Sequence, residues 1–395
     1  MKNLKIKDLP LELREFANVD DKKNVKSILA CKSSVEIALL SKFSIRYDSF
    51  KQLIYLNDRI YDPATDYDDV ADCLCRMGFK LTAQFLQLLK RRIVYLAKNH
   101  SFDSGIELLN KIPKWDKVDR WKALADSLHI SDPLWGKFLF ISIVYRLQHP
   151  EGVQHQFIHI LHGDQACGKS SFFEVISLQR DMFSREVDFY DSKDCIARAI
   201  KGISVVEIPE LLGKGSRSDD YIKTMLSKDY YQYRPLYTET IEKVTLRNVF
   251  CGSTNEQNFL TDASGNRRFM IATVTGKIDL LSIDYMKEQL YAQALAEVKD
   301  YRWIIKKVNE YNEVNNRSYE VRSIYYETLM RFKPEELHMK TSTEILVDCF
   351  GVKPKDITKR QLVEVGKAMR NLNYFVHIKR VNNSTAKCWC SEELF

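Results

Sequence analysis

The first hundred residues combine short apolar runs with two longer amphipathic segments. Residues 44–48 and 52–57 have the short apolar composition and the bounding turn residues of strands. From 67 to 100 the apolar residues recur at helical spacing, most regularly over 81–98, which predicts two helices. The pattern breaks near Pro113 and Trp115, so we expect a small α+β domain over residues 1–115.

A different pattern begins at residue 116 and continues to 308. The segment 136–147 is apolar on all sides, and periodicity alone leaves it as either a buried helix or a buried strand. Helical segments alternate with short apolar strands, which are expected at 157–161, 203–208, 249–255 and 269–274. This alternation is typical of an α/β fold with a mostly parallel sheet and helices packed against it.

The chain becomes polar after about residue 310, which favours a connector over residues 309–330. The remaining segment, 331–395, contains two helical patterns followed by two short strands, at 343–350, 359–371, 374–378 and 386–390. Two helices followed by a hairpin predict a winged-helix-like domain.

Composition narrows the class of protein. The 395 residues are 45% hydrophobic and 29% charged, as in globular proteins. The sequence has no apolar run long enough to cross a membrane and no apolar secretory leader, so we expect a cytoplasmic protein without a membrane partner. The net charge of +7 permits binding to a polyanion. The nine cysteines include two C-x-C pairs but no C-x2-C pair, which favours reduced thiols and argues against a zinc site.

The clearest chemical motif is the segment Gly163-Asp-Gln-Ala-Cys-Gly168-Lys169-Ser170, which matches the P-loop pattern G-x4-G-K-[ST]. Glycine lets backbone N–H groups curl around phosphate, lysine supplies positive charge, and the serine hydroxyl ligates Mg²⁺. The motif lies between a predicted strand and a predicted helix, as this mechanism requires. We therefore expect ATP and Mg²⁺ as cofactors, with contacts from Gly163, Asp164, Gln165, Ala166, Cys167, Gly168, Lys169, Ser170 and Ser171.

An acidic strand should complete such a site. Glu207 ends the apolar run 203–208, and Glu210 follows on the next loop. We assign Glu207 to the metal shell together with Ser170, directly or through water. Either glutamate could act as the general base toward water, or one of them could be a solvated carboxylate at a strand end.

Two further polar features follow in the chain. Asn255 ends a third strand, where its amide could orient water near the γ-phosphate, although a turn-forming asparagine would look identical. Arg267 and Arg268 follow a Gly-Asn turn, so they are placed on a tip. Such an arginine could reach a neighbouring subunit's γ-phosphate and stabilise transition-state charge, or form an ordinary basic surface pair.

In this order, the segments resemble the virulence-associated protein E family, whose ATPase core is similar to a superfamily-3 helicase of the AAA+ class. The resemblance covers roughly 40–305 and includes Trp115-Asp116, Arg146–Pro150, the P-loop, 206–211, Gly252–Asn255, Gly265–Phe269 and Gln289–Ala294. It implies a ring, with a hexamer as the expected form, that holds ATP between subunits. Asn255 would then be the sensor residue, and Arg267 or Arg268 the arginine finger acting in trans. The resemblance also implies a role in the replication of a phage or mobile genetic element.

DNA contacts are expected from two places. The segment 234–247 should form a hairpin ahead of the third strand, with Arg234, Tyr237 and Lys243 as candidate contacts. Tyr237 could stack on a base or simply pack. Lys379, Arg380 and Lys387 flank the predicted wing. The leading hypothesis is an ATP-dependent DNA helicase that translocates on single-stranded DNA. The alternative is an AAA+ switch that assembles on DNA or on a partner without unwinding.

Overall fold

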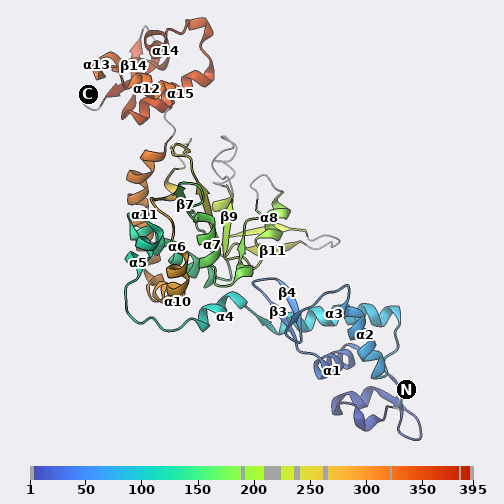
Figure 1. Cartoon of the computed structure of the whole chain (residues 1–395). Helices are drawn as coiled ribbons and strands as arrows, with labels where there is room; N and C mark the ends of the chain where they lie inside the picture. Colours follow the sequence, from blue (N-terminus) through green and yellow to red (C-terminus); the bar gives the residue numbers. More distant parts are fainter. Residues whose placement is uncertain are drawn as a thin grey trace. The chain divides into compact units, whose positions relative to one another are not determined.

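The computed structural model describes residues 4–187, 192–208, 224–234, 241–260, 266–320, 323–381 and 384–391 (Figure 1). The chain divides into two compact units. The first contains Met1–Asn255 and Arg267–Val314, and the second contains Glu256–Asn266 and Asn315–Phe395. Helices and parallel strands together give the mixed α/β fold that the sequence predicts.

The N-terminal part is built on a four-stranded sheet in the order β5-β4-β3-β6. Its two predicted strands are confirmed as β3 (Ile45–Asp48) and β4 (Leu53–Leu56), which pair antiparallel. The two predicted helices are α2 (Asp66–Arg76) and α3 (Ala83–Asn99), and the Thr82 side chain caps α3 by accepting the N–H of Phe85. The remaining elements are β1 (Ala17–Val19), β2 (Val25–Ile28), α1 (Lys32–Lys42), β5 (Arg59–Ile60) and β6 (Ser101–Phe102).

A five-stranded parallel sheet organises the central part, in the order β13-β7-β12-β9-β8. Its strands are β7 (Ile158–Gly163), β8 (Phe183–Ser184), β9 (Val205–Ile208), β12 (Val249–Thr254) and β13 (Phe269–Val274). Four of them confirm strands expected from the sequence. Because β7, β12 and β9 are parallel neighbours, their carboxyl ends meet at one edge of the sheet. The helices of this part are α4 (Ser104–Lys111), α5 (Trp121–Leu128), α6 (Pro133–Leu147), α7 (Lys169–Ile176), α8 (Lys193–Ala199), α10 (Leu280–Glu297) and α11 (Tyr301–Asn315).

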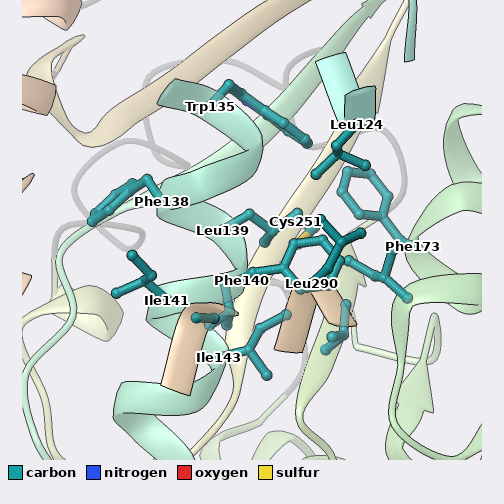
Figure 2. Packing of buried hydrophobic residues seen from close by; sticks show 14 of the residues in the cluster. Leu124, Trp135, Phe138, Leu139, Phe140, Ile141, Ile143, Phe173, Cys251 and Leu290 are labelled. Carbon is teal, nitrogen blue, oxygen red and sulfur yellow. The ribbon is translucent and has the colours of Figure 1, made fainter. Parts of the chain in front are cut away.

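The ambiguous apolar segment is a helix, α6, and it lies in the largest hydrophobic cluster. Asp132 caps its first turn and Pro133 occupies a position where a missing N–H costs nothing. Its side chains are buried on every side, as expected for a helix surrounded by other elements. Figure 2 shows Phe140 of α6 beside Cys251 of β12 and Leu290 of α10.

The C-terminal unit contains the predicted helices, α14 (Ser342–Phe350) and α15 (Lys359–Asn371), and the predicted hairpin, β14 (Tyr374–Val381) with β15 (Ser384–Ser391). Two shorter helices, α12 (Ile324–Leu329) and α13 (Pro334–Leu337), precede them. Leu329 and Leu337 are buried in one cluster with Trp389.

The expected connector over 309–330 differs from the structure. Helix α11 continues through Asn315 and a 3₁₀ turn follows over Asn316–Tyr319, so only part of this segment is irregular. The reason is that Tyr301, Ile304 and Val308 bury one stripe of α11, whereas most residues after Val308 are polar and conceal the end of the helix in the sequence.

Two arginines join the end of α6 to the chain between β11 (Glu242–Thr245) and β12. Arg146 donates to the carbonyl of Leu246, and Arg247 donates to the carbonyl of Leu147. Arg247 also pairs with Asp103, its Nη2 lying 3.1 Å from Oδ1, and Asp103 caps α4. Arg247 is 4% exposed, so this ion pair lies in the interior.

His159 on β7 is a second buried polar group, enclosed by Trp135 and Phe138. Neither of its ring nitrogens has a hydrogen-bond partner in the described part of the chain. Burial lowers the pKa of His159 to about 3, because the imidazolium would lose its hydration. The ring therefore stays neutral in the folded protein.

Within the described residues, no helix is long and apolar enough to span a membrane. The cysteines of the described ranges are thiols, consistent with the reduced state expected from the sequence.

The interior ion pair generates the first prediction. Replacing Arg247 with Met leaves Asp103 without its cation, and the free energy of unfolding should fall by about 2–3 kcal/mol. The control is Arg46→Met, because Arg46 and Asp58 form a pair whose side chains are 42% and 79% exposed. That substitution should cost less than about 0.5 kcal/mol. Urea denaturation measures both, and equal losses would contradict the assignment.

His159 generates the second prediction. Below about pH 6.5 the unfolded chain binds a proton that the folded chain excludes, so this residue lowers stability as the pH falls from 6.5 toward 3. His159→Phe removes that loss. Between pH 6 and 4 its free energy of unfolding should rise relative to that of wild type by about 1.4 kcal/mol for each unit by which the pH falls. Urea denaturation at pH 8 isolates the packing difference. A pH-independent difference would contradict burial as a neutral ring.

Candidate nucleotide site

The loop between β7 and α7 adopts backbone angles that favour glycine. Gly163 and Gly168 have φ values of 152° and 102°, and Ala166 has a φ of 63°. A Cβ at Gly163 would lie 2.7 Å from the carbonyl oxygen of Val274, so no larger residue fits there. Gly168 occupies the N-cap position of α7. The loop thus leads directly into a helix N-terminus, where backbone N–H groups and the helix dipole favour an anion.

Lys169, the first residue of α7, is 7% exposed. Its Nζ donates to the carbonyl oxygens of Gly163 at 2.8 Å and Asp164 at 2.6 Å, and to Asn255 Oδ1 at 2.9 Å. Asn255 directly follows β12, so the expected sensor residue and the P-loop lysine meet at the carboxyl edge of the sheet. The ammonium group is held by three oxygen acceptors at the mouth of the loop.

Ser170 and Glu207 also meet, as the assignment of both to a metal requires. Ser170 Oγ donates to Glu207 Oε1 at 2.5 Å, and Ser253 Oγ donates to the same oxygen at 3.0 Å. Glu207 lies on β9, is 2% exposed, and pairs in register with Cys251 of the intervening strand β12. Sequence reasoning missed Ser253, although it precedes Asn255 by only two residues.

Arg185 is a second residue that sequence reasoning missed. Its Nε donates to Glu207 Oε2 at 3.0 Å, and its Nη2 donates to the carbonyl oxygen of Ser170 at 2.9 Å. Arg185 follows β8, which is only two residues long and so gives no periodic signal. The pairing of Ser184 with Val206 is what brings it beside Glu207.

The other P-loop residues occupy different environments. Asp164, Gln165, Ala166 and Ser171 are exposed around the loop. Cys167 is buried, and its carbonyl oxygen accepts the N–H of Ile278, which fixes the loop against the chain after β13. Glu210 lies outside the described residues, so its expected role is not assigned a geometry.

Burial and charge also act on two neighbours of the site. Burial, with a smaller contribution from Glu207, raises the pKa of the Cys251 thiol well above its usual range. Burial, followed by the charge of Lys169, lowers the pKa of His162. Cys251 therefore stays a neutral thiol beside Glu207.

The oxygen ligands that this edge offers suit magnesium. No group of three or more His, Cys, Asp and Glu side chains within the described ranges could enclose a metal on its own. The Ser170 hydroxyl and the Glu207 carboxylate, 2.5 Å apart, supply one neutral and one anionic oxygen. Mg²⁺ is typically bound by one or two protein oxygens together with substrate phosphates and water, so this pair fits it.

Arg267 and Arg268 lie at the other edge of the sheet. They belong to the 3₁₀ turn Asn266–Arg268 just before β13, whose first residue, Phe269, pairs with Ile158 at the start of β7. The P-loop follows the end of β7, about 20 Å away for six residues of parallel strand. Both arginines therefore lie far from the P-loop of their own chain, and they line a cavity of about 330 Å³ with Gln154, Gln156, Phe157, Tyr301, Ile305 and Asn309.

The candidate DNA contacts occupy two hairpins. β10 (Tyr230–Tyr233) and β11 pair antiparallel, so an antiparallel pair does precede β12, but its first strand lies before the expected segment 234–247, and residues 235–240 lie outside the described residues. Arg234 is exposed, and Lys243 lies 4.2 Å from the centre of the Tyr230 ring. Tyr237 lies outside the described residues. In the C-terminal unit, Lys379 and Arg380 on β14 and Lys387 on β15 are exposed.

A family model for the virulence-associated protein E-like domain matches residues 109–321, more than half of the chain. The chain belongs to this family. The virulence-associated protein E-like domain spans the P-loop, the acidic strand, Asn255 and the arginine pair, which confirms the resemblance noted from the sequence.

Two solved structures are similar to the chain that carries this domain. The apo structure of the NrS-1 C-terminal region has a TM-score of 0.49 at 12% identity, covering 90% of this chain and 98% of that one. An A-form apo structure of the same region has a TM-score of 0.46 with the same identity and coverage. No curated protein sequence matches the chain.

Proposed function

We propose that the protein binds and hydrolyses ATP at the carboxyl edge of its parallel sheet. The observation that carries this proposal is a convergence of four residues. Lys169 and Ser170 begin α7, Glu207 lies on β9, and Asn255 follows the neighbouring strand β12. These four residues come from three segments that are up to 86 positions apart, and each has the side chain that phosphoryl transfer requires.

Each residue has a distinct role in this proposal. The loop around Gly168 and the N-terminus of α7 bind the phosphates, and Lys169 places a positive charge on the β- and γ-phosphates. Ser170 and Glu207 would hold Mg²⁺, and the metal would supply positive charge to the phosphate oxygens. Asn255 orients the attacking water with its amide. Glu207 or Glu210 accepts the proton from that water.

We further propose that the arginine pair acts on the nucleotide of a neighbouring subunit. Arg267 and Arg268 are about 20 Å of strand away from their own P-loop, so action in cis would require a rearrangement of the sheet. Action in trans requires only that the two sheet edges of adjacent subunits meet. Such head-to-tail contacts form a ring when they close, and we propose a ring with a hexamer as the expected form.

The consequence is a motor that acts on DNA. The hairpin β10–β11 carries Lys243 and is followed by β12, and Asn255 of the nucleotide site directly follows β12. A conformational change at the nucleotide site can therefore be transmitted to the hairpin through β12. We propose an ATP-dependent helicase that takes part in replication and moves on single-stranded DNA. Arg234 and Lys243, and Lys379, Arg380 and Lys387 in the C-terminal unit, would contact phosphates, and Tyr237 would stack on a base.

The nucleotide site generates the third prediction. Lys169→Ala removes the ammonium group that would lie beside the β- and γ-phosphates. Steady-state ATP hydrolysis should therefore fall by about 100-fold or more. The control is Lys122→Ala, at an exposed position of α5, which should keep wild-type turnover. Unchanged hydrolysis in the Lys169 variant would contradict the site assignment. Opening of a forked duplex by wild type separates a helicase from an ATP-driven switch that only assembles on DNA.

The arginine pair generates the fourth prediction. Arg268→Ala should abolish hydrolysis and leave ATP binding nearly intact. Mixing it in equal amounts with Lys169→Ala should restore about one quarter of wild-type hydrolysis, because random assembly pairs an intact P-loop with an intact arginine at one interface in four. The same mixture made with Arg267→Ala identifies which arginine acts. No recovery at any mixing ratio for either variant would contradict action in trans.

A further inference from the structure

Arg185 contacts both residues of the proposed metal site. Its guanidinium bridges two groups, donating from Nε to Glu207 Oε2 and from Nη2 to the backbone carbonyl of Ser170. It also lies 3.5 Å from Glu174 on α7. One planar side chain thus ties the acidic strand β9 to the first turn of the helix that follows the P-loop.

The hydrogen bonds of Glu207 divide between its two oxygens. Oε1 accepts the hydroxyls of Ser170 and Ser253, and Oε2 accepts Arg185. Glu207 is 2% exposed, so these donors set the rotation of its carboxylate. With Oε2 held by the guanidinium, Oε1 is the oxygen directed to Ser170.

We propose that Arg185 is the positioning residue of the nucleotide site, fixing the Glu207 carboxylate so that Oε1 faces the metal. This inference rests on the proposed function, because it concerns the Mg²⁺ that Ser170 and Glu207 would share. Partners that orient a metal-binding carboxylate from behind typically contribute 10- to 100-fold to metal affinity or activity. Lysine cannot replace Arg185 fully, because only a guanidinium reaches both oxygens with two parallel N–H groups.

Metal dependence of nucleotide binding tests the proposal without relying on turnover. A fluorescent ATP analogue is titrated against the full chain at increasing Mg²⁺, and separately in EDTA. Arg185→Ala should raise the Mg²⁺ concentration for half-maximal tight binding by about 10- to 100-fold. Binding in EDTA should change by less than about threefold, because the phosphate contacts of the loop and Lys169 remain. For Arg185→Lys, the Mg²⁺ concentration for half-maximal binding should lie between those of wild type and Arg185→Ala.

The matched control is Arg180→Ala. Arg180 contacts the same Glu174 carboxylate at 3.4 Å but is 92% exposed, and within the described residues it is Arg185 that pairs with Glu207. It should leave the Mg²⁺ dependence at the wild-type value, and so should Glu174→Gln. A shift in either control equal to that of Arg185→Ala would place the effect at Glu174 and overturn the proposal.

The remaining outcomes separate this proposal from the proposed function. Wild-type Mg²⁺ dependence in both folded Arg185 variants, with tight nucleotide binding retained, overturns the positioning role alone. An equal loss of binding in EDTA means that Arg185 contacts phosphate directly, which also overturns it. Failure of the wild-type chain to bind nucleotide under any condition contradicts the proposed function itself. Thermal unfolding of each variant excludes misfolding as the cause of a loss.

Discussion

The parallel register of β7, β12 and β9 is the constraint on which the candidate site depends. Gly252 pairs with Ile160 on one side and Ile208 on the other, so the carboxyl ends of all three strands lie at the same edge of the sheet. Only in that register do Asn255 and Glu207 lie within hydrogen-bond distance of the P-loop, Asn255 of Lys169 and Glu207 of Ser170. Slipping one strand by a single residue would turn Glu207 to the opposite face of the sheet. The apolar helix α6 and the cluster around it stabilise this register.

The same edge carries two buried charges of opposite sign, and each is solvated by protein groups. Lys169 is held by two backbone carbonyls and an amide oxygen, and Glu207 by two hydroxyls and a guanidinium. Removing such groups from water costs several kcal/mol per ion unless these hydrogen bonds form. Because neither charge depends on the other for its partners, the lysine and the glutamate can each serve a different part of one ligand. This division suits a nucleotide with a metal, whose phosphates are anionic and whose metal is cationic.

The sequence predicted the parts of the site that follow fixed spacing. The P-loop is contiguous, and Glu207 and Asn255 each end an apolar run, so their positions could be read directly. Arg185 and Ser253 could not, because their roles arise from strand pairing across 22 and 46 positions. Helix α6 was ambiguous because it is apolar all round, and the end of α11 was hidden by its polar faces. The sequence was sufficient to place Arg267 and Arg268 at the edge of the sheet opposite the P-loop, because both precede a parallel strand, whereas the P-loop follows one.

Under the proposed function, the position of the arginine pair and the P-loop at opposite edges of the sheet constrains how subunits assemble. One chain presents a phosphate site at the carboxyl edge of its sheet and an arginine pair at the amino edge. A twofold dimer joins identical patches, and it completes both sites only if one patch contains both halves. Two halves about 20 Å apart along the strands instead favour head-to-tail contacts, in which every subunit uses one edge toward each neighbour. Such contacts close into a ring or extend into a filament, and a closed ring leaves no subunit with an incomplete site. The parallel sheet that assembles the site thus also sets the direction in which subunits would join.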